Sequence, residues 1–176
     1  MVKSKLEGIF AEEGITVEDN PISRTLYDKS RMGEINRGKF KYSLQEALYL
    51  LECNKLIIFS TTNKELTSDE FLKKARKIDK TFWIRYLVFK DLRSRGYIVK
   101  TALKFGADFR VYDKGIKPGE DHAKWVVFPV HESNTLTWHD FSAKNRVSHS
   151  TRKKLLMAIV DNEDDVTYYE IAWKKP

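Results

Sequence analysis

The chain has 176 residues, enough for one domain or two small ones, and its 41% hydrophobic content is enough to fill a core. It carries 32 basic and 25 acidic residues, and the net charge of +7 favours polyanionic partners without establishing one. A membrane-spanning protein is disfavoured because no apolar run approaches the roughly 18 residues of a span, and a secreted one because the N-terminus lacks the apolar segment of a signal peptide.

Most of the positive charge lies in the second half of the chain. Up to residue 80 there are 15 basic and 13 acidic residues, and after it there are 17 and 12. The single cysteine, Cys53, cannot form an intrachain disulfide, and its apolar surroundings predict a buried thiol. We therefore expect an intracellular, cytoplasmic protein.

The first half predicts a small domain of mixed strands and helices. Residues 6–42 scatter apolar side chains among glycines and the pair Asn20-Pro21, which predicts short strands joined by turns. Ser43-Leu-Gln-Glu46 is a capping-box pattern that opens a helix over 44–52. A short strand follows at 56–59.

Thr67-Ser-Asp-Glu70 is a second capping box, and it opens a helix whose basic run from Lys73 to Lys80 reads as a solvated face. A new helix begins at Thr81 and ends at Gly96, a residue typical of the position after a helix. We place the domain boundary between them, which gives domains 1–80 and 81–176.

The second domain reads as a helix followed by a mixed, mainly antiparallel sheet. The predicted strands are 97–103, 107–112, 122–130, 153–160 and 166–173, with a helix over 138–147 capped by Thr137 or Ser133 and an acidic turn at Asp161–Asp165. The fold class is therefore α+β: a small N-terminal mixed domain and a C-terminal helix-plus-mixed-sheet domain.

Three residues at the margins of these strands are candidates for chemistry. Tyr112 ends one strand, His122 begins the next across a glycine-containing loop, and Lys153 begins a later one. Each has a plainer reading, since a tyrosine or histidine there usually packs and a lysine is usually solvated. The remaining histidines, His131, His139 and His149, are taken as structural.

Together the three side chains suit cleavage of RNA through its own 2′-hydroxyl. Histidine, with an unperturbed pKa near 6.5, suits the acid that protonates the leaving oxygen. Lysine offers a compact positive charge where negative charge develops. Tyrosine, with a pKa near 10, serves as the base only beside cations that favour its phenolate, so this assignment is the weakest.

Several segments resemble archaeal tRNA-splicing endonucleases over nearly the whole chain. They are Asp91–Tyr112, His122 with the following Trp-Val-Val run, Arg146-Val-Ser-His-Ser-Thr-Arg-Lys153-Lys-Leu-Leu-Met-Ala158, Asp165-Val-Thr-Tyr-Tyr-Glu170, and in the first half Gly33, Gly38 and Leu44–Leu51. The resemblance implies the restriction-endonuclease-like fold of that family in the C-terminal domain.

The resemblance also implies roles for single residues. Tyr112 matches the proposed general base, His122 the general acid, and Lys153 the lysine that stabilises the transition state. Lys153 rather than Lys154 fits the family pattern Lys-x-Leu-x-x-Ala, and Lys154 then reads, with Arg152, as a flanking phosphate contact or plain surface charge.

Two further positions match a clamp for a flipped-out base. Arg146 matches an arginine that stacks on a bulge base, and Trp173 falls where the second member of the sandwich lies. A guanidinium plane and an aromatic ring both grip an unstacked base. For Trp173 a core position or a dimer contact is an equally good reading.

The acidic turn Asp161–Asp165 lacks the ligand spacing and central glycine of a calcium loop. The resemblance implies instead that this turn inserts into a basic cleft on another subunit, and that the last strand pairs with its copy in a dimer of dimers. The chain has Glu163-Asp-Asp165 where the family usually has a glycine, so the turn geometry is open.

The expected function is that of a metal-independent endoribonuclease, without cofactor, of the short homotetrameric class. Its substrate would be precursor tRNA with a bulge–helix–bulge motif, and its products would carry 2′,3′-cyclic phosphate and 5′-hydroxyl ends. One alternative is a non-catalytic RNA-binding subunit. Another is a metal-dependent nuclease of the restriction-enzyme class, which needs a carboxylate where this chain has His122-Ala-Lys124.

Overall fold

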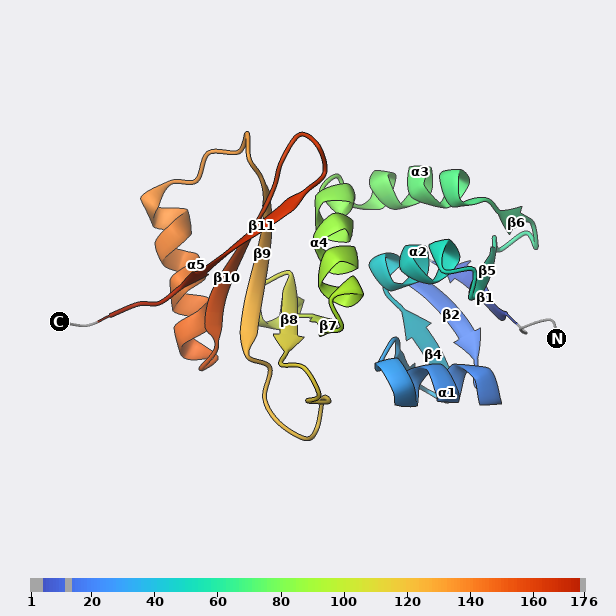
Figure 1. Ribbon diagram of the computed structural model, residues 1–176. Coiled ribbons are helices and arrows are strands. Elements are labelled where there is room, and N and C mark those ends of the chain that lie inside the picture. The colour runs from blue at the N-terminus through green and yellow to red at the C-terminus, as the bar shows by residue number, and fades with distance from the viewer. Residues whose placement is uncertain (1–4, 12–13, 175–176) are drawn as a thin grey trace. The chain divides into compact units, whose positions relative to one another are not determined.

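The computed structural model describes residues 5–11 and 14–174, and the chain divides into two compact units, Met1–Phe82 and Trp83–Pro176. Each unit combines helices with a sheet of its own, so the expected α+β class is confirmed (Figure 1). Within the described ranges, no helix is long and apolar enough to cross a membrane.

The first unit is a sheet with helices packed on one face. Its elements are β1 (Leu6–Ala11), β2 (Gly14–Glu18), α1 (Pro21–Ser30), β3 (Glu34–Asn36), β4 (Lys39–Tyr42), α2 (Leu44–Glu52), β5 (Leu56–Phe59), β6 (Glu65–Leu66) and α3 (Ser68–Ile78). The strand order is β3-β4-β2-β1-β5-β6, with β1 and β5 parallel. Along β4, Phe40 and Tyr42 are buried while Lys39 and Lys41 are exposed, so the second face meets solvent.

Helix α1 corrects the expectation of strands and turns alone over residues 6–42. The Asn20 side chain accepts hydrogen bonds from the backbone N–H groups of Ile22 and Ser23, at 2.9 Å each. The Ser23 hydroxyl oxygen accepts a hydrogen bond from Asn20 N at 2.9 Å. Pro21 occupies the first helical position, where no intrahelical donor is needed. The Asn-Pro pair therefore starts a helix rather than marking a turn.

The two predicted capping boxes are confirmed. Ser43 caps α2 and Thr67 caps α3, and in each the glutamate three residues on completes the reciprocal bond. The expected burial of Cys53 is wrong, because this residue is exposed. It follows the last residue of α2, where the chain turns into β5 through Asn54 at φ 57°.

The second unit places its sheet between two helices (Figure 1). Its elements are α4 (Phe82–Ser94), β7 (Ile98–Thr101), the single 3₁₀ turn η1 (Leu103–Phe105), β8 (Phe109–Tyr112), β9 (Trp125–His131), α5 (Trp138–Ser150), β10 (Lys154–Val160) and β11 (Val166–Ile171). The strand order is β11-β10-β9-β8-β7. Only β9 and β10 run parallel, so the sheet is mixed as expected.

Both faces of this sheet are covered, which accounts for the apolar runs in its central strands. Val126 and Phe128 of β9 belong to one buried cluster, against which Val147 of α5 packs. On the other face, the ring of Phe109 in β8 lies 6.0 Å from that of Phe89 in α4, centroid to centroid. Continuous apolar strands are what a doubly covered sheet requires.

All five predicted strands of this unit are shorter in the structure, and two of the differences bear on the site. The predicted strand 97–103 ends at Thr101, because the chain turns through η1. The predicted strand 122–130 begins only at Trp125, so His122 lies in the connecting loop and not on the strand. The backbone N–H of His122 donates to the Asp121 carboxylate at 2.6 Å instead of joining the sheet ladder.

Candidate active site

The end of helix α5 places Lys153. The N–H of Lys153 donates to the carbonyl of Ser148 at 2.8 Å and that of Arg152 to the carbonyl of His149 at 3.0 Å, the paired bonds of a Schellman ending. Arg152 occupies the left-handed position of that motif, φ 54°, which glycine usually fills. Lys153 thus leaves the helix in a fixed direction, one residue before β10 begins.

The Lys153 side chain is half-buried, and its ammonium donates to the carbonyl of Thr151 at 2.9 Å. Burial lowers the pKa of Lys153 below its ordinary value, and the positive charge of Arg110 lowers it further. The lysine is therefore a cation in a partly desolvated place beside a second cation.

Tyr112 and His122 bound a loop whose two ends are tied together. Tyr112 is the last residue of β8 and only 4% exposed. Beyond the loop, the N–H of Lys124 donates to the carbonyl of Val111 at 2.9 Å, and the Lys124 ammonium pairs with the Asp113 carboxylate at 2.7 Å. The residues between fold back in two turns, and Gly119 takes φ 97° there.

The three predicted catalytic residues meet at one cavity of about 350 Å³. Tyr112, His122 and Lys153 line it together with Phe105, Arg110, Gly119, Glu120, Asp121 and Ala123. They come from three different segments: the end of β8, the following loop and the junction of α5 with β10. A base, an acid and a cation around one space can act on a single bound phosphodiester.

A second cavity of about 620 Å³ shares His122 and Lys153 with the first and is lined by further basic residues. Among these, Lys124 pairs with Asp113 at 2.7 Å and Lys154 with Glu170 at 2.6 Å. Arg152, at the same cavity, is exposed. Basic residues therefore line both cavities that His122 borders, and they can bind a polyanion there.

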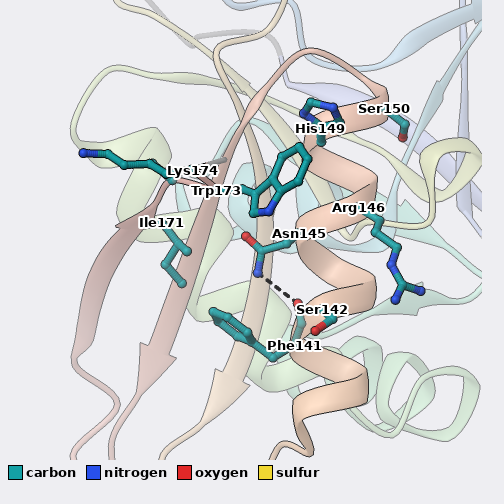
Figure 2. A pocket seen from close by; sticks show the side chains of 10 residues that line it. Phe141, Ser142, Asn145, Arg146, His149, Ser150, Ile171, Trp173 and Lys174 are labelled. Carbon is teal, nitrogen blue, oxygen red and sulfur yellow. Dashed lines mark hydrogen bonds between the residues drawn. The ribbon is translucent and has the colours of Figure 1, made fainter. Parts of the chain in front are cut away.

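Arg146 and Trp173 line a separate pocket of about 600 Å³ between α5 and the end of β11 (Figure 2). Trp173 is 62% exposed, which rules out the core reading within this chain. Figure 2 shows the Arg146 guanidinium directed away from the Trp173 ring, so the sandwich is not closed in the free chain. The two residues lie at one pocket without touching.

The ring that faces Trp173 belongs to His149, which the sequence reading took as structural. The two ring centroids are 4.6 Å apart in an edge-to-face arrangement. Asn145 lines the same pocket, with its side-chain amide donating to the carbonyl of Phe141 at 3.0 Å. The spacing along α5 could have indicated both residues, because His149 lies three residues after Arg146 and four after Asn145, and residues three or four apart share a helix face.

Phe105 and Arg110 were also missed, although both line the cavity of the catalytic candidates. Arg110 stands two residues before Tyr112 on β8, and side chains two apart on a strand share a face. Phe105 carried no such signal, because it lies between the predicted strands 97–103 and 107–112, in a connection for which no structure was predicted.

The acidic turn Asp161–Asp165 is a tight hairpin held by its own first residue. One carboxylate oxygen of Asp161 accepts the N–H groups of Glu163 and Asp165, at 2.9 Å each. Asp164 adopts φ 66°, the left-handed conformation that a glycine would take, and its carboxylate accepts from the Trp83 indole at 3.1 Å. An aspartate tolerates this conformation better than most residues, so the turn forms without glycine.

In the described ranges, 5–11 and 14–174, no group of three or more histidine, cysteine, aspartate or glutamate side chains is arranged to hold a metal ion. The two carboxylates beside the catalytic candidates are engaged by backbone donors. Asp121 accepts from His122 N at 2.6 Å, and Glu120 accepts from Lys117 N at 3.0 Å.

Comparison with known proteins identifies relatives for both units. The family model described as the tRNA intron endonuclease N-terminal domain matches residues 6–72, and the model of the catalytic C-terminal domain matches residues 82–168. A tRNA-splicing endonuclease of Methanothermobacter thermautotrophicus is 40% identical over 172 residues, which cover 98% of this chain and 99% of that protein.

Two other archaeal proteins of the same name are similar to this chain. That of Nanoarchaeum equitans is 48% identical over 139 residues, 76% of this chain and 88% of its own length. That of Pyrococcus furiosus is 37% identical over 174 residues, 99% of each chain.

Proposed function

This chain belongs to the tRNA intron endonuclease family, and we propose that it excises introns from precursor tRNA at bulge–helix–bulge motifs. It is an endoribonuclease of tRNA splicing, a tRNA-intron lyase. The observation that carries the catalytic proposal is the single cavity lined by Tyr112, His122 and Lys153.

Cleavage begins at the substrate's own 2′-hydroxyl. Tyr112, reacting as its phenolate, takes the proton from that hydroxyl as the hydroxyl oxygen attacks the adjacent phosphorus. The position of Tyr112 is fixed, because the residue is nearly buried and its strand, β8, pairs with β7 up to this residue. The attack forms a bond from the 2′-oxygen to phosphorus and builds negative charge on the non-bridging oxygens.

His122 completes the reaction by giving a proton to the 5′-oxygen as its bond to phosphorus breaks. Lys153 holds its ammonium at the developing negative charge. The products are a 2′,3′-cyclic phosphate on one fragment and a 5′-hydroxyl on the other. Every proton taken from the 2′-hydroxyl is matched by one delivered to the leaving oxygen, and Lys153 supplies the cation, so the proposed step uses protein side chains alone.

Arg146 and Trp173 grip a base of the bulge when it leaves its stack. Their shared pocket of about 600 Å³ is large enough for a nucleobase, and its floor includes Phe141 and Ile171. The Arg146 guanidinium must turn toward Trp173 on binding, because it points away in the free chain (Figure 2).

The active assembly is a dimer of dimers. β11 is an edge strand, and its residue Tyr169 is 57% exposed. Both features favour pairing with β11 of a second copy. The Asp161–Asp165 turn then inserts into a neighbouring subunit, carrying four carboxylates at its tip. Two cuts per intron require two active sites at a set separation, which symmetry supplies.

The test is to incubate the protein with a bulge–helix–bulge RNA in EDTA and to identify the product ends. We expect two cuts, each leaving a 2′,3′-cyclic phosphate and a 5′-hydroxyl. A requirement for magnesium, or 5′-phosphate ends, would refute the mechanism. An isolated chain that binds this RNA without cutting it would support the non-catalytic subunit instead.

A further inference from the structure

Arg110 is a cation at the catalytic cavity for which the proposed mechanism has no use. It lies on β8 two residues before Tyr112, on the same face of the strand, and lines the cavity with Tyr112 and Lys153. A half-buried arginine normally finds a carboxylate or a set of acceptors, because a desolvated guanidinium is costly when unpaired.

Among the described residues, Arg110 has no carboxylate partner. Its Nε atom is buried and has no hydrogen-bond partner there. The carboxylates nearest to hand in the cavity, Glu120 and Asp121, accept backbone N–H groups of the loop. Other arginines of the chain do pair: Arg24 lies 2.6 Å from Asp19 and Arg95 lies 2.8 Å from Asp91.

Phe105 brings the unpaired guanidinium and the catalytic ammonium to one place. The Arg110 guanidinium carbon lies 5.9 Å from the centre of the Phe105 ring, and the Lys153 ammonium lies 5.6 Å from it. Phe105 is 40% exposed, although a large apolar side chain is normally buried, and it lines the cavity. The positive charge of Arg110 also lowers the pKa of Lys153, as expected for two cations that line one cavity.

We propose that Arg110 is a second phosphate-binding residue of the active site, which contacts the non-bridging oxygens of the scissile phosphate alongside Lys153 while Phe105 holds both cations in place. This rests on the proposed function. The pentacoordinate intermediate of RNA cleavage carries up to two negative charges, and Lys153 balances one of them. A guanidinium offers parallel N–H donors that fit two phosphate oxygens.

The arrangement also gives a role to the two cations that line one cavity in the free chain. Their mutual repulsion is relieved when an anion binds between them, and it is relieved most when the anion carries the most charge. Binding energy is therefore released at the transition state more than at the ground state, which is the condition for faster catalysis. Arg110 should accordingly affect the rate of cleavage more than the affinity for RNA.

The experiment compares Arg110→Met, Arg110→Lys and the control Arg24→Ala in single-turnover cleavage of a bulge–helix–bulge RNA. Methionine keeps the apolar stem against Phe105 and removes the charge. We expect Arg110→Met to lower the rate by about 10²–10³-fold, the size seen when one donor to a developing oxyanion is lost. Arg110→Lys should recover part of that rate, and Arg24→Ala should equal the wild type.

Affinity is measured with the same RNA carrying a 2′-deoxy nucleotide at each cut site, so that it binds without reacting. Its Kd should change by no more than about tenfold in Arg110→Met, consistent with the loss of one phosphate contact. Guanidinium ions, added at concentrations that leave the melting temperature unchanged, should restore part of the rate to Arg110→Met and none to Lys153→Ala. A residue with a merely structural role would not give this rescue.

The pH profile supplies a second readout. The titratable and charged groups that line the cavity with Lys153 are Arg110, Tyr112, Glu120, Asp121 and His122. Arg110 lowers the pKa of Lys153, so its removal should raise that pKa. An NMR titration of the lysine side chains, with Lys153→Ala to assign the signal, should therefore show Lys153 losing its proton at a higher pH in Arg110→Met than in the wild type.

The inference is overturned if folded Arg110→Met cleaves within about threefold of the wild type while Lys153→Ala is inactive. It is also overturned if the whole loss appears in Kd, which would make Arg110 a general RNA contact. A wild-type protein that fails to cleave would instead refute the proposed function.

Discussion

Two adjacent lysines at the start of β10 differ in what they bind, and this difference separates their roles. The Lys154 ammonium is paired with the Glu170 carboxylate at 2.6 Å, whereas Lys153 lines the cavity and its ammonium donates to the backbone carbonyl of Thr151. We predict that Lys153→Ala lowers the single-turnover cleavage rate by about 10²–10³-fold, and that Lys154→Ala stays within a few-fold of wild type. An inactive Lys154→Ala beside an active Lys153→Ala would move the assignment by one position.

His122 can be tested through the leaving group. A sulfur in place of the 5′-bridging oxygen leaves as a stable thiolate and does not need a proton. We predict that His122→Ala cleaves the ordinary substrate about 10²–10⁴-fold more slowly than wild type, and that it cleaves the sulfur-containing substrate at nearly the wild-type rate. Equal impairment on both substrates would show that His122 places the loop and donates no proton.

At this scale the sequence predicted which residues meet, but not all that surrounds them. Tyr112, His122 and Lys153 were chosen by residue type and resemblance, and the fold brings them to one cavity. Arg110 could not be singled out, because what distinguishes it is the absence of a partner near it in space. Phe105 depends on a single 3₁₀ turn that no periodic pattern announces.

The turn at the end of α5 holds Arg152 in a left-handed conformation. Two substitutions there can distinguish the cost of this backbone conformation from the effect of the arginine charge. Arg152→Gly and Arg152→Ala both remove the charge, but only glycine relieves a strain of about 1 kcal/mol. We predict that the glycine variant is at least as stable as the alanine variant when the free energy of unfolding is measured by urea denaturation. Both variants should weaken RNA binding equally and reduce the slope of log K against log salt concentration by about one.

Glycine and alanine variants that bind RNA as tightly as the wild type would make Arg152 plain surface charge. Stability that is lower with glycine than with alanine would mean that the left-handed turn costs little here, and that chain entropy dominates.

Helix starts were the most predictable elements, because a capping box is a local chemical arrangement. Ser43 and Thr67 each cap a helix as expected, and Thr137, one of the two candidate caps, begins α5. Helix α1 was missed since its box uses Ser23 instead of glutamate or glutamine, and its proline resembled a turn signal. The parallel pairing of β9 with β10 depends on long-range packing, which local patterns do not encode.

The molecule as a whole is predicted to act as a dimer of dimers joined through its last strand. The native mass of the wild type should be about four times the 20.7 kDa of one chain. Tyr169 is exposed on the edge strand β11, so Tyr169→Glu should place like charges together across the two-fold axis and lower that mass. The control is Ile9→Glu, an exposed apolar residue on β1 in the other unit.

A wild-type chain that remains a monomer at all concentrations, or a Tyr169→Glu variant with unchanged mass, would contradict this assembly. A wild type that reaches full mass and activity only with a second, different subunit would make it one component of a mixed complex. Cleavage by the Tyr169→Glu dimer at one site only would fit the need for paired active sites.

The central claim is that the RNA supplies its own nucleophile within the cavity of Tyr112, His122 and Lys153. The most direct measurement is cleavage, in EDTA, of a bulge–helix–bulge RNA with a single 2′-deoxy nucleotide on the 5′ side of one cut site. We predict no cleavage at that site, normal cleavage at the other, and undiminished binding. Cleavage at the 2′-deoxy site would refute this mechanism, because only a water or a protein nucleophile could then have attacked the phosphorus.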